Sequence, residues 1–438
     1  MRREYAMKKR LCNVMRCIAA GLTISAVCGV PAGCSVKEAQ NMLMADVNYP
    51  KAYSFDDYDE RIQRYEENAV EDSFIDAVNG FSYRTASELL GEGKNVCYSP
   101  ISLYYALAAA TEGAQGTTRE ELLALLGEKN MDVVAEQSSR LYNILFRDNK
   151  VGKLLIHGSV WIDDSLDIND DYVNRLADKY YTESYHGDFA SNKFINAMKK
   201  WVKDNTGGME MEAEPDAGTV LTILNTVYFC DEWLDRFDKK LTKKDNFYLR
   251  DGSTVECYFM NSRDFSHYYA KGEGFTRSSL SFKNGEVMSF VLPDEGVDIR
   301  ELIAAPEGIE EVLFGGEGST GEVVWKIPKF CYDTELKLND AISKLGVTSC
   351  FGEAADFSGI GRLDSGEGIF INEIKQNSHI EIDENGVVAS AYTQIDYNGM
   401  ALPDGRADMI LDRPFLYAIA DRSGVVIFVG VCENPGAK

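Results

Sequence analysis

The amino-acid sequence predicts a mixed α+β fold organised as a single large domain. Helical patterns dominate up to about residue 220, and strand patterns dominate from there onward. Helices gathered early and strands gathered late are typical of α+β domains. The chain has 438 residues, 45% of them hydrophobic, so it can bury a sizeable core, although its length alone would also allow two or three domains.

Three patterns predict helices in the first half of the domain. Apolar residues recur at helical spacing over 74–89. Ser99 followed by Pro100 is typical of a helix start, because serine caps free backbone amides and proline fits the first turn. Thr118 with Glu121 predicts a capping box at the start of the next helix.

Five stretches of strand-forming residues predict the sheets of the second half. Each is short, apolar or alternating, and bounded by turn-forming residues. The predicted strands are 222–229, 286–292, 323–332, 379–384 and 425–431.

A further strand-like stretch at 387–396 has no evident partner in the sequence. Between Gly386 and Leu402 there is no proline, so the stretch could enter the middle of a sheet without losing a ladder donor. An ordinary surface strand or hairpin arm is the alternative for this stretch taken alone. One face of its alternation is small or β-branched and consists of Val387, Ala389, Ala391, Thr393 and Ile395, and Ser390 lies on the other face.

The first 34 residues are typical of an export signal rather than of folded structure. Six lysines and arginines precede an apolar run at 17–30, which is shorter than a membrane span. The run ends in Val30-Pro-Ala-Gly-Cys34, which is similar to the cleavage box of bacterial lipoproteins. We therefore expect Cys34 to carry lipid and to anchor the protein at the surface of a bacterial membrane. A plain secretory signal, giving a secreted or periplasmic protein, is the alternative.

These features divide the chain into three parts. Residues 1–33 are expected to be a lipoprotein-type signal peptide. Residues 34–71 are polar and acidic, and they are expected to form a tether. Residues 72–438 are expected to form the folded domain.

The composition and the motifs exclude several function classes. A net charge of −25 disfavours nucleic acid and anionic headgroups as partners, which leaves the lipid anchor as the expected membrane contact. The four histidines lack zinc-site spacing, and neither a G-x-S-x-G elbow nor a Walker loop is present. The G-x-G-x-x-G at 316–321 precedes a strand pattern and is interpreted as a turn. We therefore expect no enzyme activity, no cofactor and no metal.

Six cysteines follow Cys34, and they are far apart in the sequence. Most lie in apolar, strand-like runs, so buried free thiols are expected. They are Cys97, Cys230, Cys257, Cys331, Cys350 and Cys432.

A series of short motifs resembles the serpin family over about 360 residues. Each motif is weak by itself, but together they stand in the order of the family. They are Asn95-Val-Cys-Tyr-Ser-Pro-Ile-Ser102, Gly113-Ala-Gln-Gly-Thr117, Leu224-Asn-Thr-Val-Tyr-Phe229 with Trp233 and Phe237, Leu292-Pro-Asp-Glu-Gly296, Ile327-Pro-Lys-Phe330, Ala355-Asp-Phe-Ser-Gly359, Asp383-Glu-Asn-Gly386, Asp412-Arg-Pro-Phe415, and Phe428, Gly430 and Pro435.

The resemblance implies a serpin fold, with helices around a large mixed central sheet and an exposed reactive loop. It further implies a monomer that inhibits serine proteases as a suicide substrate. The protease cleaves the loop, and the loop then inserts into the sheet while the protease is still attached as an acyl-enzyme. A non-inhibitory binding or chaperone-like serpin is the alternative.

The resemblance also assigns roles to individual residues. Counting from Glu384 as the first hinge residue places the scissile bond at Met400-Ala401, with Tyr397-Asn398 as a second possibility. Methionine suits elastase-like, chymotrypsin-like or subtilisin-like pockets. Glu384, Gly386, Val387, Ala389, Ser390, Ala391 and Thr393 are then the hinge and inserting loop.

The region where the sheet opens is expected around Ser99, Ser102, Asn225 and Trp233. Gln376 stands where many family members have a histidine, so the hydrogen-bond network must differ there. Alternation along the strand places His379 on the opposite face from Gln376.

Overall fold

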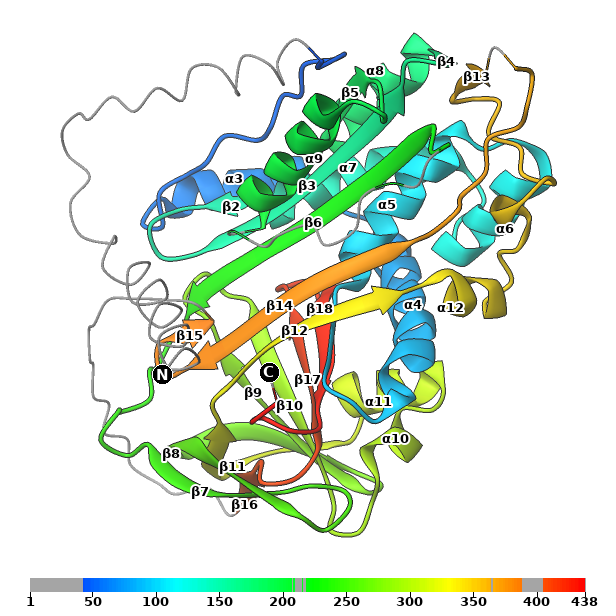
Figure 1. Ribbon diagram of the computed structural model, residues 1–438. Coiled ribbons are helices and arrows are strands. Elements are labelled where there is room, and N and C mark those ends of the chain that lie inside the picture. Colours follow the sequence, from blue (N-terminus) through cyan, green and yellow to red (C-terminus); the bar gives the residue numbers. More distant parts are fainter. Residues whose placement is uncertain are drawn as a thin grey trace, which may run out of the picture.

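The computed structural model describes residues 42–206, 208, 215, 218–363, 365–387 and 405–437. Helices lie on both faces of a large sheet, and others pack against a second sheet (Figure 1). Those of the first half are α3 (Tyr58–Glu67), α4 (Asp72–Leu89), α5 (Pro100–Gly113), α6 (Gly116–Leu126), α7 (Met131–Leu145), α8 (Asp170–Tyr180) and α9 (Asn192–Asn205). Those of the second half are α10 (Ile299–Leu302), α11 (Pro306–Phe314) and α12 (Asn339–Lys344), and short 3-10 turns lie at Leu90–Glu92 and Ser349–Phe351.

The first sheet has seven strands in the described residues, in the order β12-β14-β15-β6-β3-β2, with β5 also paired to β3. β14 and β6 both run antiparallel to β15, so they are parallel to each other. The strands are β12 (Phe330–Lys337), β14 (Lys375–Asp383), β15 (Gly386–Val387), β6 (Leu221–Glu232), β3 (Lys153–Asp163), β2 (Arg147–Asp148) and β5 (Thr182–Gly187).

The second sheet has nine strands in the described part of the chain, in the order β1-β18-β17-β10-β9-β8-β11-β16, with β7 also paired to β8. A separate pair joins β13 (Gly361–Leu363) to β4 (Leu166–Ile168). The strands of the second sheet are β1 (Val96–Tyr98), β18 (Val426–Cys432), β17 (Phe415–Ala420), β10 (Val287–Pro293), β9 (Phe275–Ser281), β8 (Thr254–Gly272), β11 (Glu317–Pro328), β16 (Arg406–Ile410) and β7 (Lys243–Tyr248).

Helix α5 lies between the two sheets and contacts both β6 and β18. Apolar residues surround it on all sides, and its tyrosines Tyr104 and Tyr105 are almost fully buried. A helix that is apolar all round is typical of a core position. The start of α5 is therefore held in the middle of the molecule, directly behind the first sheet.

The predicted start of α5 is confirmed, and the predicted capping box is wrong. Ser99 is the N-cap, and its hydroxyl accepts a hydrogen bond from the Ser102 amide. Helix α6 instead begins at Gly116 with no side-chain cap. The Glu121 carboxylate accepts hydrogen bonds of 2.8 Å from the amides of Thr348 and Ser349, so it holds a distant segment rather than its own helix end.

The strand predicted over 323–332 is two strands in the structure. β11 ends at Pro328 and belongs to the second sheet, whereas β12 starts at Phe330 and belongs to the first. Lys329 separates the two strands, and its side chain donates a hydrogen bond to Glu384 near one end of the first sheet. The other four predicted strands correspond to β6, β10, β14 and β18.

The described part of the segment predicted as a tether, residues 42–71, contacts the folded body. The Met44 amide donates to the Ser184 carbonyl on β5, and the His186 amide donates to the Met42 carbonyl. Helix α3 lies in the same segment, and its Arg64 is buried with its guanidinium over the Tyr53 ring. The ordered body therefore begins before residue 72. No helix in the described ranges is long and apolar enough to cross a membrane.

Candidate functional site

The candidate site is the end of the first sheet where β15 lies between β14 and β6 (Figure 1). Gly386 pairs with Asp383 on one side and with Glu232 on the other. Val387 pairs with Ile382 and Asp231. Within the described ranges, no ladder joins β14 directly to β6, so these two parallel strands are connected through a strand of only two residues.

Gly386 can occupy this position because it lacks a side chain. Its φ is +147°, a conformation that residues with a Cβ rarely adopt. A Cβ placed there would lie 2.1 Å from the Asp231 carbonyl oxygen. Val387 follows it into the sheet and is buried, with 4% of its surface exposed. The small and β-branched residues expected at the hinge therefore fit the sheet at the first two positions.

Glu384 fixes the turn that leads from β14 into β15. Its carboxylate accepts hydrogen bonds from Lys329 at 2.7 Å and from Thr242 at 2.8 Å, and its carbonyl accepts one from the Phe237 amide. Burial alone raises the pKa of the Glu384 carboxyl, but the hydrogen bonds, led by that of Lys329, outweigh it and hold the pKa below its usual range. The carboxylate is therefore charged at neutral pH. It connects the turn before β15 to Lys329, the residue between β11 and β12.

Trp233 holds the same turn from the side of β6. Its indole ring stacks on Phe282 with the ring centroids 4.5 Å apart. The indole N–H donates to the Asp383 carbonyl at 3.0 Å, and the Trp233 amide donates to the Asn385 carbonyl at 2.9 Å. The C-terminal end of β6 and the turn after β14 therefore form one hydrogen-bonded unit.

The start of α5 makes contacts with both strands that border β15. The Ser99 amide donates to the Gln376 side-chain oxygen, and the Gln376 side-chain nitrogen donates to the Ser99 carbonyl, each at 2.9 Å. The Ser102 hydroxyl donates to the Asn225 side-chain oxygen at 3.0 Å. Gln376 lies on β14 and Asn225 lies on β6. One helix end thus ties together two strands that have no direct ladder in the described residues.

Of the other predicted residues, one is placed by the structure and the rest are not described. His379 is on the exposed face of β14, opposite to buried Gln376. The loop residues Ala389, Ser390, Ala391, Thr393, Met400 and Ala401, together with Cys34, lie outside the described residues.

Three of the six cysteines are buried as expected, and three are not. All six cysteines in the described residues are free, and Cys97, Cys350 and Cys432 are buried as expected. Cys230 and Cys257 are half-buried. Cys331 is exposed, because the alternation of β12 turns it away from the core.

Sequence reasoning missed several residues at the site. Asp231 is buried opposite Val387, and burial, with the charge of Glu286 adding to it, raises its pKa to about 7. Arg147 and Glu286 form a buried ion pair nearby, and Arg147 lowers the pKa of Asp231 in turn. In the sequence, Lys329 stands out only as part of the motif Ile327-Pro-Lys-Phe330. The available signal for Asp231 is the acidic pair that begins two residues after the apolar strand 222–229.

Comparison with known proteins gives a consistent result. The family model described as Serpin (serine protease inhibitor) matches residues 76–435. Serpin-Z2B of Triticum aestivum is 29% identical over 379 residues, which cover 81% of this chain and 94% of that protein. Serpin-ZX of Arabidopsis thaliana is 27% identical over 368 residues, which cover 79% and 93%.

Solved structures show the same fold. Native tengpin, a thermophilic serpin, has a TM-score of 0.76 at 24% identity, covering 89% of this chain and 97% of that one. Arabidopsis AtSerpin1 in its native stressed conformation has a TM-score of 0.71 at 25% identity, covering 84% and 99%. The family model matches more than half of the chain, so this protein, in which the two-residue strand β15 lies between β14 and β6, belongs to the serpin family.

Proposed function

We propose that this protein inhibits serine proteases as a suicide substrate, by inserting its cleaved loop between β14 and β6. The observation that supports this most directly is the two-residue strand β15, which pairs with both neighbours, while no other strand of the described residues lies between them. An inserting segment gains ladder hydrogen bonds on both of its edges. The sheet is therefore arranged to accept more of the chain that follows Val387.

The chemistry of the first step belongs to the protease. Its serine hydroxyl attacks the carbonyl carbon of Met400, and the peptide bond to Ala401 breaks. The serine proton ends on the departing amine of Ala401, and the Met400 acyl group stays bound to the protease as an ester. Insertion of about 14 residues at about 3.3 Å each would then carry the protease nearly 50 Å along the sheet. The energy comes from the strain stored in the uncleaved form.

The test is to mix the full chain with elastase-like, chymotrypsin-like, subtilisin-like and trypsin-like proteases and to separate the products by denaturing electrophoresis. We expect a covalent complex with one or more of the first three classes, and a released peptide that begins at Ala401 by mass spectrometry. Met400→Arg is the matched variant, and it should shift complex formation to the trypsin-like enzyme. Cleavage of the loop by every protease without any complex would refute inhibition and favour a non-inhibitory binding role.

We propose further that lipid on Cys34 anchors the protein at the surface of a bacterial membrane. The support is the sequence alone: a basic start, an apolar run and the residues Ala-Gly-Cys34. Cys34→Ala should abolish incorporation of labelled fatty acid and release or fail to process the protein. Cys28→Ala, in the same apolar run, is the control and should label normally. Unchanged labelling of the Cys34 variant would refute the anchor.

A further inference from the structure

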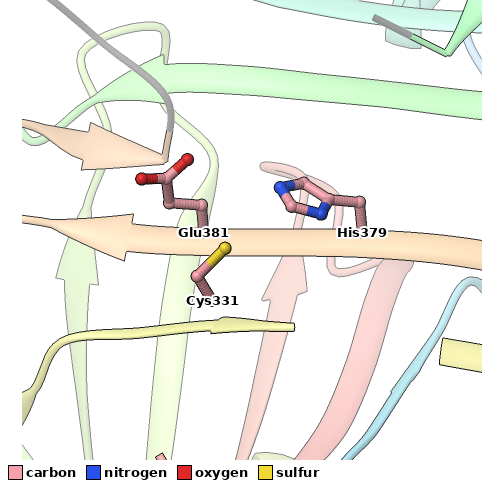
Figure 2. Close-up of side chains that lie close together, drawn as sticks. All are labelled: Cys331, His379 and Glu381. Atoms are coloured by element: carbon pink, nitrogen blue, oxygen red, sulfur yellow. The ribbon is translucent and has the colours of Figure 1, made fainter. Parts of the chain in front are cut away.

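The exposed face of the β12–β14 pair brings together four side chains that can bind metal ions. Both strands alternate exposed and buried residues along their paired length. In their register Cys331 lies opposite Glu381, and Asp333 lies opposite His379. Residues two apart on a strand share a face, so all four lie on the same side. Figure 2 shows the Cys331 sulfur reaching over β14 to a position between Glu381 and His379 in that view.

The spacing of these side chains fits one small cation. The Cys331 sulfur, a ring nitrogen of His379 and a carboxylate oxygen of Glu381 all lie within 4.8 Å of one another. In a tetrahedral zinc site with ligand distances of about 2.0 to 2.3 Å, neighbouring ligand atoms are about 3.3 to 3.5 Å apart. The three ligand atoms must therefore move roughly 1 Å closer together, and rotation of these exposed side chains allows this movement.

His379 is already oriented as a zinc-binding histidine usually is. Its Nδ1 lies 2.6 Å from a carboxylate oxygen of Asp333. Donation from Nδ1 to a carboxylate fixes the ring and leaves Nε2 as the free ligand atom, an arrangement typical of zinc sites. This contact comes from the neighbouring strand, so the pairing of β12 with β14 supplies both the ligands and the group that orients one of them.

The charges around Cys331 favour a cation. Cys331 lies opposite Glu381 in the register of the two strands, and Asp333 lies two residues along on the same face, so two carboxylates surround the thiol. A divalent cation would take the place of the thiol proton, which passes to solvent, and would offset the negative charge of the three groups.

We propose that Cys331, His379 and Glu381 bind one zinc-class divalent cation, with Asp333 orienting His379 and water in the fourth position. Thiolate and imidazole ligands select such an ion over magnesium or calcium. The bound ion would link β12 to β14, the pair of strands that borders one side of β15. Binding to the folded state alone would raise the stability of the intact protein by mass action.

The test is a calorimetric titration of the full, metal-free chain with Zn²⁺ alone, with its thiols kept reduced. We expect one ion per chain, and at least a tenfold loss of affinity in each of Cys331→Ser, His379→Gln and Glu381→Gln. Asp333→Asn should weaken binding by about tenfold or more, because it disturbs the orientation of His379. Co²⁺ in place of Zn²⁺ should give a thiolate-to-metal absorption band that Cys331→Ser abolishes.

Two matched variants control for nonspecific effects. His186→Gln removes a half-buried histidine that pairs with Asp164, and Cys257→Ser removes a half-buried thiol elsewhere. Both should bind Zn²⁺ as the wild type does. Because the proposed ligands are exposed, their variants should unfold at the same urea midpoint as the wild type without metal. Absence of stoichiometric binding, or wild-type affinity in Cys331→Ser and His379→Gln, would overturn the site whether or not the protein inhibits proteases.

Discussion

Gln376 and Ser99 are joined by two hydrogen bonds of 2.9 Å, in which the side-chain amide of one residue pairs with the backbone amide and carbonyl of the other. Both residues are buried. Because Ser102 holds Asn225 from the same helix end, the start of α5 fastens both β14 and β6. Any strand that enters between them must work against this connection, so its strength helps to set how readily the sheet opens.

Gln376→Leu should lower the stability of the intact protein. The change removes both hydrogen bonds and leaves the buried Ser99 amide without its partner, which costs about 1 to 3 kcal/mol. Asn377→Ala, on the exposed face of the same strand, is the control and should stay within about 0.5 kcal/mol. Urea unfolding of the three proteins measures the difference. Equal midpoints for Gln376→Leu and the wild type would show that this pair does not hold the sheet.

The contact between Glu384 and Lys329 should stabilise the hinge at neutral pH and fail in acid. The folded-state pKa of Glu384 is lowered, so its contribution is complete above the unfolded value of about 4.3 and is lost as pH falls through the folded value. Glu384→Gln should therefore be less stable than the wild type by about 1 to 3 kcal/mol at pH 7, and this gap should shrink below about pH 4. Urea unfolding at both pH values checks it. Glu335→Gln, an exposed position on β12, should show no such gap, and a gap for Glu384→Gln that persists unchanged in acid would contradict the account.

Val387→Glu should convert the proposed inhibitor into a substrate. The new carboxylate would lie opposite buried Asp231, whose own pKa is already raised to about 7 by burial, so two acidic groups would stand in the core where the rest of the loop must add to β15. A barrier higher by about 3 kcal/mol slows insertion roughly a hundredfold, which lets the acyl-enzyme hydrolyse first. The number of inhibitor molecules consumed per protease inactivated measures this. Val387→Thr keeps the shape and should stay close to wild type, and efficient trapping by Val387→Glu would mean that the loop does not insert by extending β15.

Much of the fold could be predicted from local patterns, because those patterns report burial. The apolar spacing at 74–89 and the Ser99-Pro100 start correspond to α4 and the start of α5. The capping box was wrong because Thr118 and Glu121 fit a local motif while their partners lie more than 220 residues away. The sequence predicts one strand over 323–332 because apolar residues stand on both sides of Lys329. In the structure the chain passes at Lys329 from the second sheet to the first.

The candidate site was less accessible to sequence reasoning, since its groups meet only in the folded chain. Ser99, Ser102, Asn225 and Gln376 could be named through a family resemblance, but the pairing of Gln376 with the Ser99 backbone could not. Cys331, His379 and Glu381 showed no zinc-site spacing, because the register of β12 against β14 brings Cys331 to the other two.

The central claim is that this sheet takes up the cleaved loop, and thermal unfolding of the loop-cleaved protein tests it most directly. About ten new ladder hydrogen bonds at about 1 kcal/mol each should raise the melting temperature by roughly 10 °C or more over the intact form. The cleaved Val387→Glu variant should show a smaller rise. A cleaved wild-type protein that melts at the temperature of the intact one would contradict insertion, and with it the proposed inhibitory mechanism.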